Sequence, residues 1–209
     1  MTPPAMQDEG PEAVPEGVLD GRGQWLLHAR RAPSPNCDLR PPGERVALLV
    51  VHGISLPPGR FGSGCVERLF LNKLDWEEHE YFKKIKGLRV SSHVLIERDG
   101  RVTQFVPFGL RAWHAGISRF RGRERCNDFS IGVELEGCDD VEYAAAQYRQ
   151  LARMVTALRV AYPGITLDRI VGHSHVAPGR KTDPGPAFRW PELGALLGAP
   201  PEWSPGKDP

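Results

Sequence analysis

The sequence predicts an α/β (α+β) domain with a mixed central β-sheet flanked by helices. Strand-like segments occur at residues 47–52, 90–96, 102–106, 129–136 and 169–171. Apolar residues at helical spacing predict one long helix at residues 144–162, which Pro163-Gly164 ends. Shorter helices are predicted at residues 65–71, 76–84 and 190–197. Strands interspersed with helices in this order indicate a sheet packed against helices.

The first predicted strand, residues 47–52, is a continuous apolar run that ends in one polar residue, His52. Its length and β-branched content predict a central strand covered on both faces. Residues 90–96 and 102–106 predict two more strands, and Asp99-Gly100 between them indicates a hairpin because both positions tolerate positive φ. Residues 24–31 are a mixed segment that predicts one helical turn or a strand.

Residues 129–136 alternate between apolar and polar side chains. Phe129, Ile131 and Val133 fall on one face, whereas Glu134 and Glu136 fall on the other. This alternation predicts a half-buried strand with two carboxylates on its open face.

Residues 172–186 concentrate reactive groups in a segment with three prolines and three glycines. This composition predicts an irregular loop without a helix or a regular strand. A loop so rich in chemical groups and so restricted in conformation indicates a functional site. An ordinary polar surface loop is the alternative.

His52 ends one predicted strand and His173 follows another, and functional groups gather at strand ends in sheets of this kind. With Asp183, they would give zinc three ligands and leave the fourth position for water. A lone histidine at a strand end is more often structural, however. Spacing alone also leaves three other histidines open as ligands, namely His93, His114 and His175.

Glu134 and Glu136 share a strand face, so either can be a general base, and periodicity does not choose between them. Lys181 is a candidate to stabilise an oxyanion, although surface lysines are more common. Residues 118–125 hold four arginines around one phenylalanine. Because guanidinium groups pair with carboxylates, this cluster either grips an anionic ligand or is a solvated loop.

Composition bounds the remaining possibilities. A chain of 209 residues that is 40% hydrophobic fits one domain, and its net charge of +1 indicates neither nucleic acid nor a membrane as a partner. No apolar run approaches the roughly 20 residues of a membrane span. The acidic, proline-rich start lacks the features of a secretory signal. We expect residues 1–20 to be a disordered extension, 21–199 the domain and 200–209 a tail.

The cysteines are scattered along the chain without a CxxC pair, at Cys37, Cys65, Cys126 and Cys138. They are predicted to be free thiols in a reducing compartment, so we expect a cytoplasmic protein.

Four motifs resemble the zinc-dependent N-acetylmuramoyl-L-alanine amidases, and more narrowly their AmpD type. They are LVVHGISLPP at residues 49–58, RAWHAG at 111–116, GRERCNDFSIGVELEG at 122–137 and RKTDPGP at 180–186. The AmpD type is the cytosolic enzyme of cell-wall recycling that acts on 1,6-anhydro-N-acetylmuramyl peptides. The likeness runs from about residue 25 to residue 197.

The resemblance implies the fold shared with peptidoglycan recognition proteins. It implies zinc as cofactor with His52, His173 and Asp183 as the metal ligands. Glu134 matches the catalytic glutamate and Lys181 the catalytic lysine. The reaction would be hydrolysis of the amide between the lactyl group of the anhydromuramic acid and L-alanine.

The arginines that hold the carboxylates of the stem peptide match Arg89 and Arg125. The anhydromuropeptide is the expected partner, and no obligate protein partner is implied. Two positions depart from the family: Gly53 stands where relatives commonly carry asparagine, and His175 where close relatives often carry aspartate.

Two other functions remain open. Non-catalytic relatives that sense muropeptides typically lose a metal ligand, whereas all three ligands are present here. A periplasmic or lytic amidase would act on the intact cell wall, but the chain shows no signal peptide and no paired cysteines.

Overall fold

The computed structural model describes residues 17–206. The first sixteen residues of the predicted disordered extension therefore lie outside the described residues. Val18 is buried in the core, and Leu19 forms an isolated bridge with Leu26. Near the other end, Trp203 packs against the core and its indole N–H donates to the carbonyl of Leu167 at 3.2 Å.

A six-stranded sheet in the order β1-β5-β4-β9-β3-β10 forms the centre of the domain. The pair β4–β5 is antiparallel and all other neighbours are parallel, so the predicted mixed sheet is confirmed. The strands are β1 (Arg30–Arg31), β3 (Leu48–Ile54), β4 (Val94–Ile96), β5 (Val102–Gln104), β9 (Ser130–Glu136) and β10 (Ile170–Gly172).

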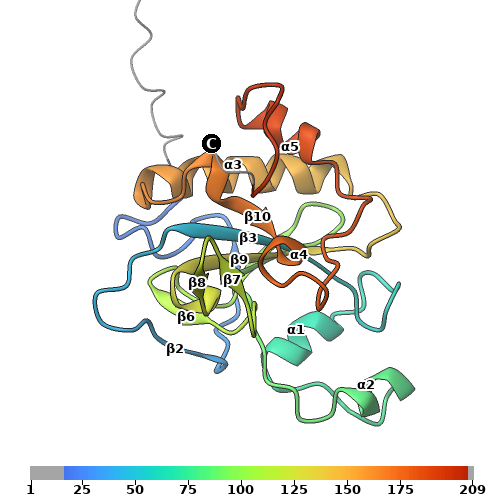
Figure 1. Ribbon diagram of the computed structural model, residues 1–209. Helices are drawn as coiled ribbons and strands as arrows, with labels where there is room; N and C mark the ends of the chain where they lie inside the picture. The colour runs from blue at the N-terminus through green and yellow to red at the C-terminus, as the bar shows by residue number, and fades with distance from the viewer. Residues whose placement is uncertain (1–16, 207–209) are drawn as a thin grey trace, which may run out of the picture.

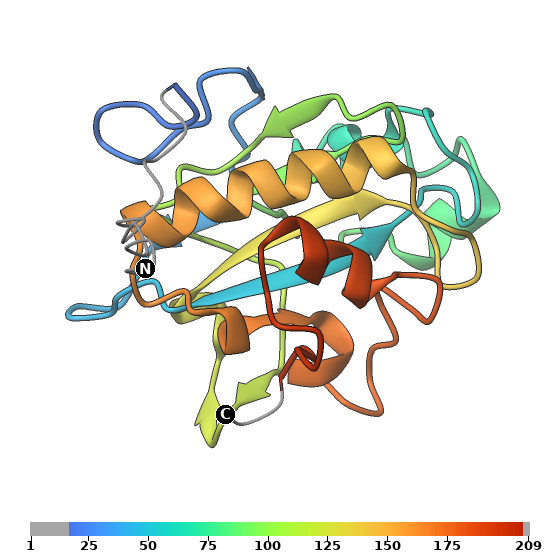
Figure 2. The same cartoon turned by 90° about the horizontal axis from the view of Figure 1, so that it is seen from above.

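One face of the sheet is covered by helix α3 (Ala145–Ala161), with α5 (Trp190–Leu196) beside it (Figures 1 and 2). The buried side of α3 packs on the odd-numbered residues of the two central strands, such as Val51 and Val133. The periodicity of the sequence predicted this helix at residues 144–162.

The opposite face is covered mostly by irregular chain (Figure 1). The elements on this side are α1 (Cys65–Phe70), α2 (Glu80–Lys84), α4 (His173–Val176), the pair β2 (Cys37–Leu39) with β6 (Leu110–Ala112), the hairpin β7 (Arg119–Phe120) with β8 (Arg123–Glu124), and the short 3-10 helix η1 (Cys126–Asp128). A second 3-10 helix, η2 (Leu167–Arg169), leads into β10.

The prediction that residues 129–136 form a half-buried strand was wrong in its burial. All seven residues of β9 are buried. The reason is that β9 lies between β3 and β4, while His114 packs over Gly132 and the backbone at Gly62 and Arg98 contacts Glu136 on the face that the alternation left open. Glu134 therefore lies in the interior rather than in solvent.

The prediction of no helix in residues 172–186 was also wrong, because α4 forms one helical turn. Its first proline is Pro178, so a single turn fits between Gly172 and that residue. Other elements are shorter than predicted. Helix α2, for example, begins at Glu80 because His79 caps it: the Nδ1 atom of His79 accepts a hydrogen bond from the Tyr81 N–H. In the β4–β5 turn only Gly100 has positive φ, at 88°.

Two further observations bear on composition. All four cysteines are free, as predicted. Within residues 17–206, no helix has the length and apolar character needed to cross a bilayer.

Candidate metal centre

His52 and Glu134 are register partners on the neighbouring parallel strands β3 and β9. Side chains alternate between the two faces of a strand, so both point away from α3. His52 was predicted to end its strand, but β3 continues to Ile54. The ring is therefore held by a strand with ladder partners on both sides, and its Nδ1 atom lies 4.0 Å from Oε1 of Glu134.

His173 is the first residue of α4, directly after β10, which pairs with β3. Asp183 lies ten residues further on, where the chain folds back: its backbone carbonyl accepts a hydrogen bond from the N–H of Ser174 at 2.9 Å. This bond brings the carboxylate of Asp183 beside both imidazoles.

Three donor atoms meet at one point in a nearly equilateral triangle. Nδ1 of His52 is 3.0 Å from Nδ1 of His173, and Oδ2 of Asp183 is 3.1 Å and 3.0 Å from these two atoms. A tetrahedral ion with bonds of about 2.0–2.2 Å would separate its ligands by about 3.3–3.6 Å. The triangle needs to widen only slightly to hold such an ion, so these residues form a candidate metal site.

The charge states of the triad suit a cation. Burial lowers the pKa of His52 to about 4, so its ring is neutral near neutral pH, as a metal ligand must be. Burial alone would raise the pKa of Asp183, but hydrogen bonds with His173 and His52 outweigh it and hold that pKa well below its usual range. The centre therefore offers the neutral ring of His52 and the negative carboxylate of Asp183 beside His173.

Glu134 and Glu136 have different surroundings. Glu134 is buried beside the triad, and its Oε2 atom has no hydrogen-bond partner among the described residues. Burial and the charge of Asp183 raise the pKa of Glu134 well above its ordinary value, while the charge of Lys181 acts against them. A buried, unpartnered carboxyl oxygen at this position marks a place for water or substrate.

Glu136, in contrast, holds two loops. Its Oε1 accepts a hydrogen bond from the N–H of Gly62 at 2.5 Å, and its Oε2 accepts a weaker one from the N–H of Arg98 at 3.4 Å. Of the two glutamates, only Glu134 has a free oxygen at the candidate metal centre.

The three histidines that spacing left open as ligands lie outside the triad. The Nδ1 atom of His175 accepts from the N–H of Gly172 at 2.9 Å, so this ring caps the start of α4. Both nitrogens of His93 are bonded to backbone, at Gly132 and Leu110. His114 contacts the far side of His52, with its Nδ1 2.9 Å from Nε2 of that ring.

The remaining predicted site residues lie on the surface. Lys181 is exposed, and its charge lowers the pKa of both His52 and Glu134, which indicates that it lies close to the triad. Arg89 is exposed between α2 and β4 and forms no ion pair within residues 17–206. Arg125 is exposed at the base of the β7–β8 hairpin, with φ of 62°.

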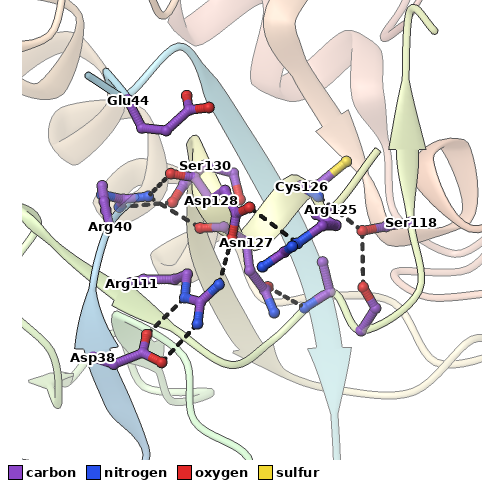
Figure 3. A network of polar contacts seen from close by, with 12 residues as sticks. Asp38, Arg40, Glu44, Arg111, Ser118, Arg125, Cys126, Asn127, Asp128 and Ser130 are labelled. Atoms are coloured by element: carbon purple, nitrogen blue, oxygen red, sulfur yellow. Dashed lines mark hydrogen bonds and ion pairs between the residues drawn. The ribbon is translucent and has the colours of Figure 1, made fainter. Parts of the chain in front are cut away.

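The basic cluster at residues 118–125 is braced by acidic partners. Its ion pairs are Arg119–Glu124, Arg121–Asp168, Arg123–Glu44 and Arg125–Asp128. Beneath it, Arg111 bridges Asp38 at 2.6 Å and Asp128 at 2.5 Å (Figure 3). These pairs hold the hairpin, and the side chain of Arg125 remains 71% exposed.

Two residues that the sequence did not single out fix the segment in front of the triad. The side-chain oxygen of Asn127 accepts hydrogen bonds from the N–H groups of His114 and Ala115, at 3.2 and 2.8 Å. The guanidinium of Arg180 donates to the carbonyls of Ala115 and Ile117 at 2.5 and 2.7 Å. Because these bonds join residues far apart in sequence, no local pattern reveals them.

The family model of the N-acetylmuramoyl-L-alanine amidases matches residues 42–186. This span includes the whole triad, Glu134 and Lys181. The chain belongs to the N-acetylmuramoyl-L-alanine amidase family. The recognition made from the sequence motifs is thereby confirmed.

Individual relatives agree with this membership. The chain is 56% identical over 180 residues to the 1,6-anhydro-N-acetylmuramyl-L-alanine amidase AmpD of Salmonella typhimurium, with 86% of this chain and 95% of the relative covered. A crystal structure of a selenomethionine derivative of AmpD superposes with a TM-score of 0.83 at 54% identity, over 86% of this chain and 99% of that one. AmpDh3 from Pseudomonas aeruginosa, solved with anhydromuramic pentapeptide, gives 0.59 at 30% identity, over 76% and 62%.

Gly53 makes room for Tyr143 in this amidase. A Cβ atom added to Gly53 would lie 2.1 Å from the hydroxyl oxygen of Tyr143 and 3.4 Å from Cα of Pro184. That hydroxyl donates to the carbonyl of Pro184 at 2.9 Å, directly after the candidate ligand Asp183. The departure at residue 53 is thus matched by an aromatic ring that supports the segment of the candidate metal site.

We expect Gly53→Ala to destabilise the amidase by about 1–3 kcal/mol, because Tyr143 must move and release Pro184. Denaturant unfolding would measure this cost. In a Tyr143→Phe background the clashing oxygen is absent, so the same substitution should cost clearly less. An equal cost in both backgrounds would show that the contact with the hydroxyl does not explain the glycine.

Proposed function

We propose that this amidase is a zinc enzyme that hydrolyses the amide between the lactyl group of 1,6-anhydro-N-acetylmuramic acid and the L-alanine of the stem peptide. This activity belongs to the recycling of peptidoglycan. The observation that carries the proposal is the free buried oxygen of Glu134 beside the triad of His52, His173 and Asp183. The AmpD relatives, similar over most of this chain, support the choice of substrate.

His52, His173 and Asp183 would hold the zinc ion, whose nitrogen and oxygen preferences suit this donor set better than those of magnesium or calcium. When bound, zinc supplies a Lewis acid that polarises a carbonyl and lowers the pKa of water to about 7.

Glu134 would act as the general base and acid. Its unpartnered Oε2 would accept a proton from the attacking water and deliver it to the departing amine of L-alanine. Lys181 would stabilise the negative charge that develops on the carbonyl oxygen. Exposed Lys181 suits this role because its charge already acts on Glu134.

Arg89 and Arg125 would bind the carboxylates of the stem peptide, because both present exposed guanidinium groups. A domain at residues 21–199, to which Val18 and Trp203 add core contacts at the two ends, and a cytoplasmic location complete the proposal. The free cysteines are consistent with a reducing compartment.

A comparison of two substrates tests this function. We expect the protein to release free peptide from anhydromuramyl peptides at least about tenfold faster than from polymeric peptidoglycan, by mass spectrometry of the products. Faster cleavage of the polymer would instead indicate a lytic amidase. Binding of the anhydromuropeptide with no product would indicate a sensor.

A further inference from the structure

The ring of His114 lies between a candidate metal ligand and a buried strand residue. Its Nδ1 atom is 2.9 Å from Nε2 of His52, and its Nε2 atom is 3.1 Å from Oγ of Ser130. The rings of His114 and His52 meet edge to face, with centroids 5.0 Å apart and planes at 88°. This geometry aligns one nitrogen of each ring along a hydrogen bond.

The direction of this hydrogen bond follows from the role of His52. If Nδ1 of His52 holds a metal, it carries no proton, so the proton of the neutral ring is on Nε2. That N–H must then donate to Nδ1 of His114. His114 in turn carries its own proton on Nε2 and donates it to the hydroxyl of Ser130.

The other histidine of the triad, His173, is held by Ala115, the residue that follows His114. The Nε2 atom of His173 lies 3.1 Å from the carbonyl oxygen of Ala115, so it donates there and leaves Nδ1 free for a metal. Asn127 binds the backbone N–H groups of both His114 and Ala115. The dipeptide His114-Ala115, which Asn127 holds in place, therefore supplies a hydrogen-bond acceptor to each imidazole of the triad.

The sheet provides a space for the ring of His114. Gly132 lies in the middle of β9, where a Cβ atom would be only 2.4 Å from Cγ and 2.5 Å from Nδ1 of His114. A glycine inside a buried strand weakens the strand and often marks a close approach of another group. Here that group is the ring that contacts His52.

We propose that His114 is a positioning residue, which fixes the tautomer and orientation of His52 so that Nδ1 of His52 faces the metal. It does not touch the substrate or the metal. The inference rests on the proposed metal site. Partners that orient metal-binding histidines in this way typically contribute about 10- to 100-fold to metal affinity.

Three substitutions at one position test the role of the nitrogen atom. In His114→Asn the amide oxygen can take the place of Nδ1 and still accept from His52, whereas in His114→Gln the polar group lies near the place of Nε2. We expect His114→Ala and His114→Gln to weaken zinc binding about 10- to 100-fold, and His114→Asn to retain most of the affinity. Competition with a chromophoric chelator on metal-free protein measures this.

His93→Gln is the matched control, since His93 is also a buried imidazole, 5.9 Å from the ring of His114, but its hydrogen bonds within residues 17–206 go to backbone and Arg40. Its zinc affinity should equal that of the unmodified protein. Unchanged affinity in His114→Ala, or equal losses in the asparagine and glutamine variants, would overturn the role of His114.

A spectrum of the unmodified protein gives a test that needs no substitution. In ¹⁵N-histidine NMR of the zinc-loaded protein, we expect protons on Nε2 of His52 and Nε2 of His114. A proton on Nδ1 of His114 would overturn the proposal. Failure of the proposed function would instead appear as zinc-loaded, unmodified protein that releases no peptide, which neither the affinities nor the spectrum measures.

Discussion

Glu134→Gln should lower kcat by about 10²- to 10⁴-fold, because an amide cannot accept a proton from the attacking water. The structure predicts this loss for Glu134 and not for Glu136 on the same strand face. Oε2 of Glu134 has no partner within the described chain, and burial together with Asp183 raises its pKa. Release of peptide from an anhydromuramyl peptide, measured at saturating substrate, gives the effect on kcat. Zinc content, measured in parallel, should be unchanged because no triad atom is altered.

Glu136→Gln is the matched control on the same strand face. Its carboxylate accepts hydrogen bonds from the backbone at Gly62 and Arg98, so its replacement should lower stability and leave kcat within a few-fold. The opposite pattern, with near-normal turnover in Glu134→Gln and a large loss in Glu136→Gln, would move the general base to Glu136.

The strand pattern of the sequence predicted which residues of β9 share a face, but it was wrong for Phe129, which lies before the strand and packs with Leu48 and Val50 on the other side. The alternation in residues 129–136 separated Glu134 from Val133, and the structure keeps that separation. The apolar run before His52 predicted a strand covered on both faces, and β3 is one. These predictions succeeded because the period of a strand is a local property of the chain.

Burial of the face of β9 that carries Glu134 was not predictable in the same way. The cover consists of irregular chain, held by contacts such as those of Asn127 with His114 and Ala115, and no periodicity marks such a segment. The spacing of histidines in the sequence therefore left His114 open as a metal ligand. In the structure His114 lies behind His52 and contacts it through one hydrogen bond. The glycine at residue 132 was visible in the sequence, but its reason became clear only when the ring that fills the space was located.

Removal of the metal should abolish hydrolysis and lower the melting temperature. Nδ1 of His52 and Nδ1 of His173 lie 3.0 Å apart, beside the half-buried carboxylate of Asp183. An ion that binds only the folded state stabilises it by about 4 kcal/mol at a free concentration 1,000 times Kd. We expect the melting temperature to rise with free Zn²⁺ in the unmodified protein and to stay flat in Asp183→Ala.

His175→Ala is the control within the same segment, because this histidine caps α4 and lies outside the triad. Its melting temperature should start lower but rise with Zn²⁺ as in the unmodified protein. Added Zn²⁺ should restore activity after chelation, whereas Mg²⁺ should not, since Mg²⁺ requires octahedral oxygen ligands. Full activity after chelation would refute the metal mechanism. A flat zinc response in His175→Ala together with a normal response in Asp183→Ala would move the third ligand to His175.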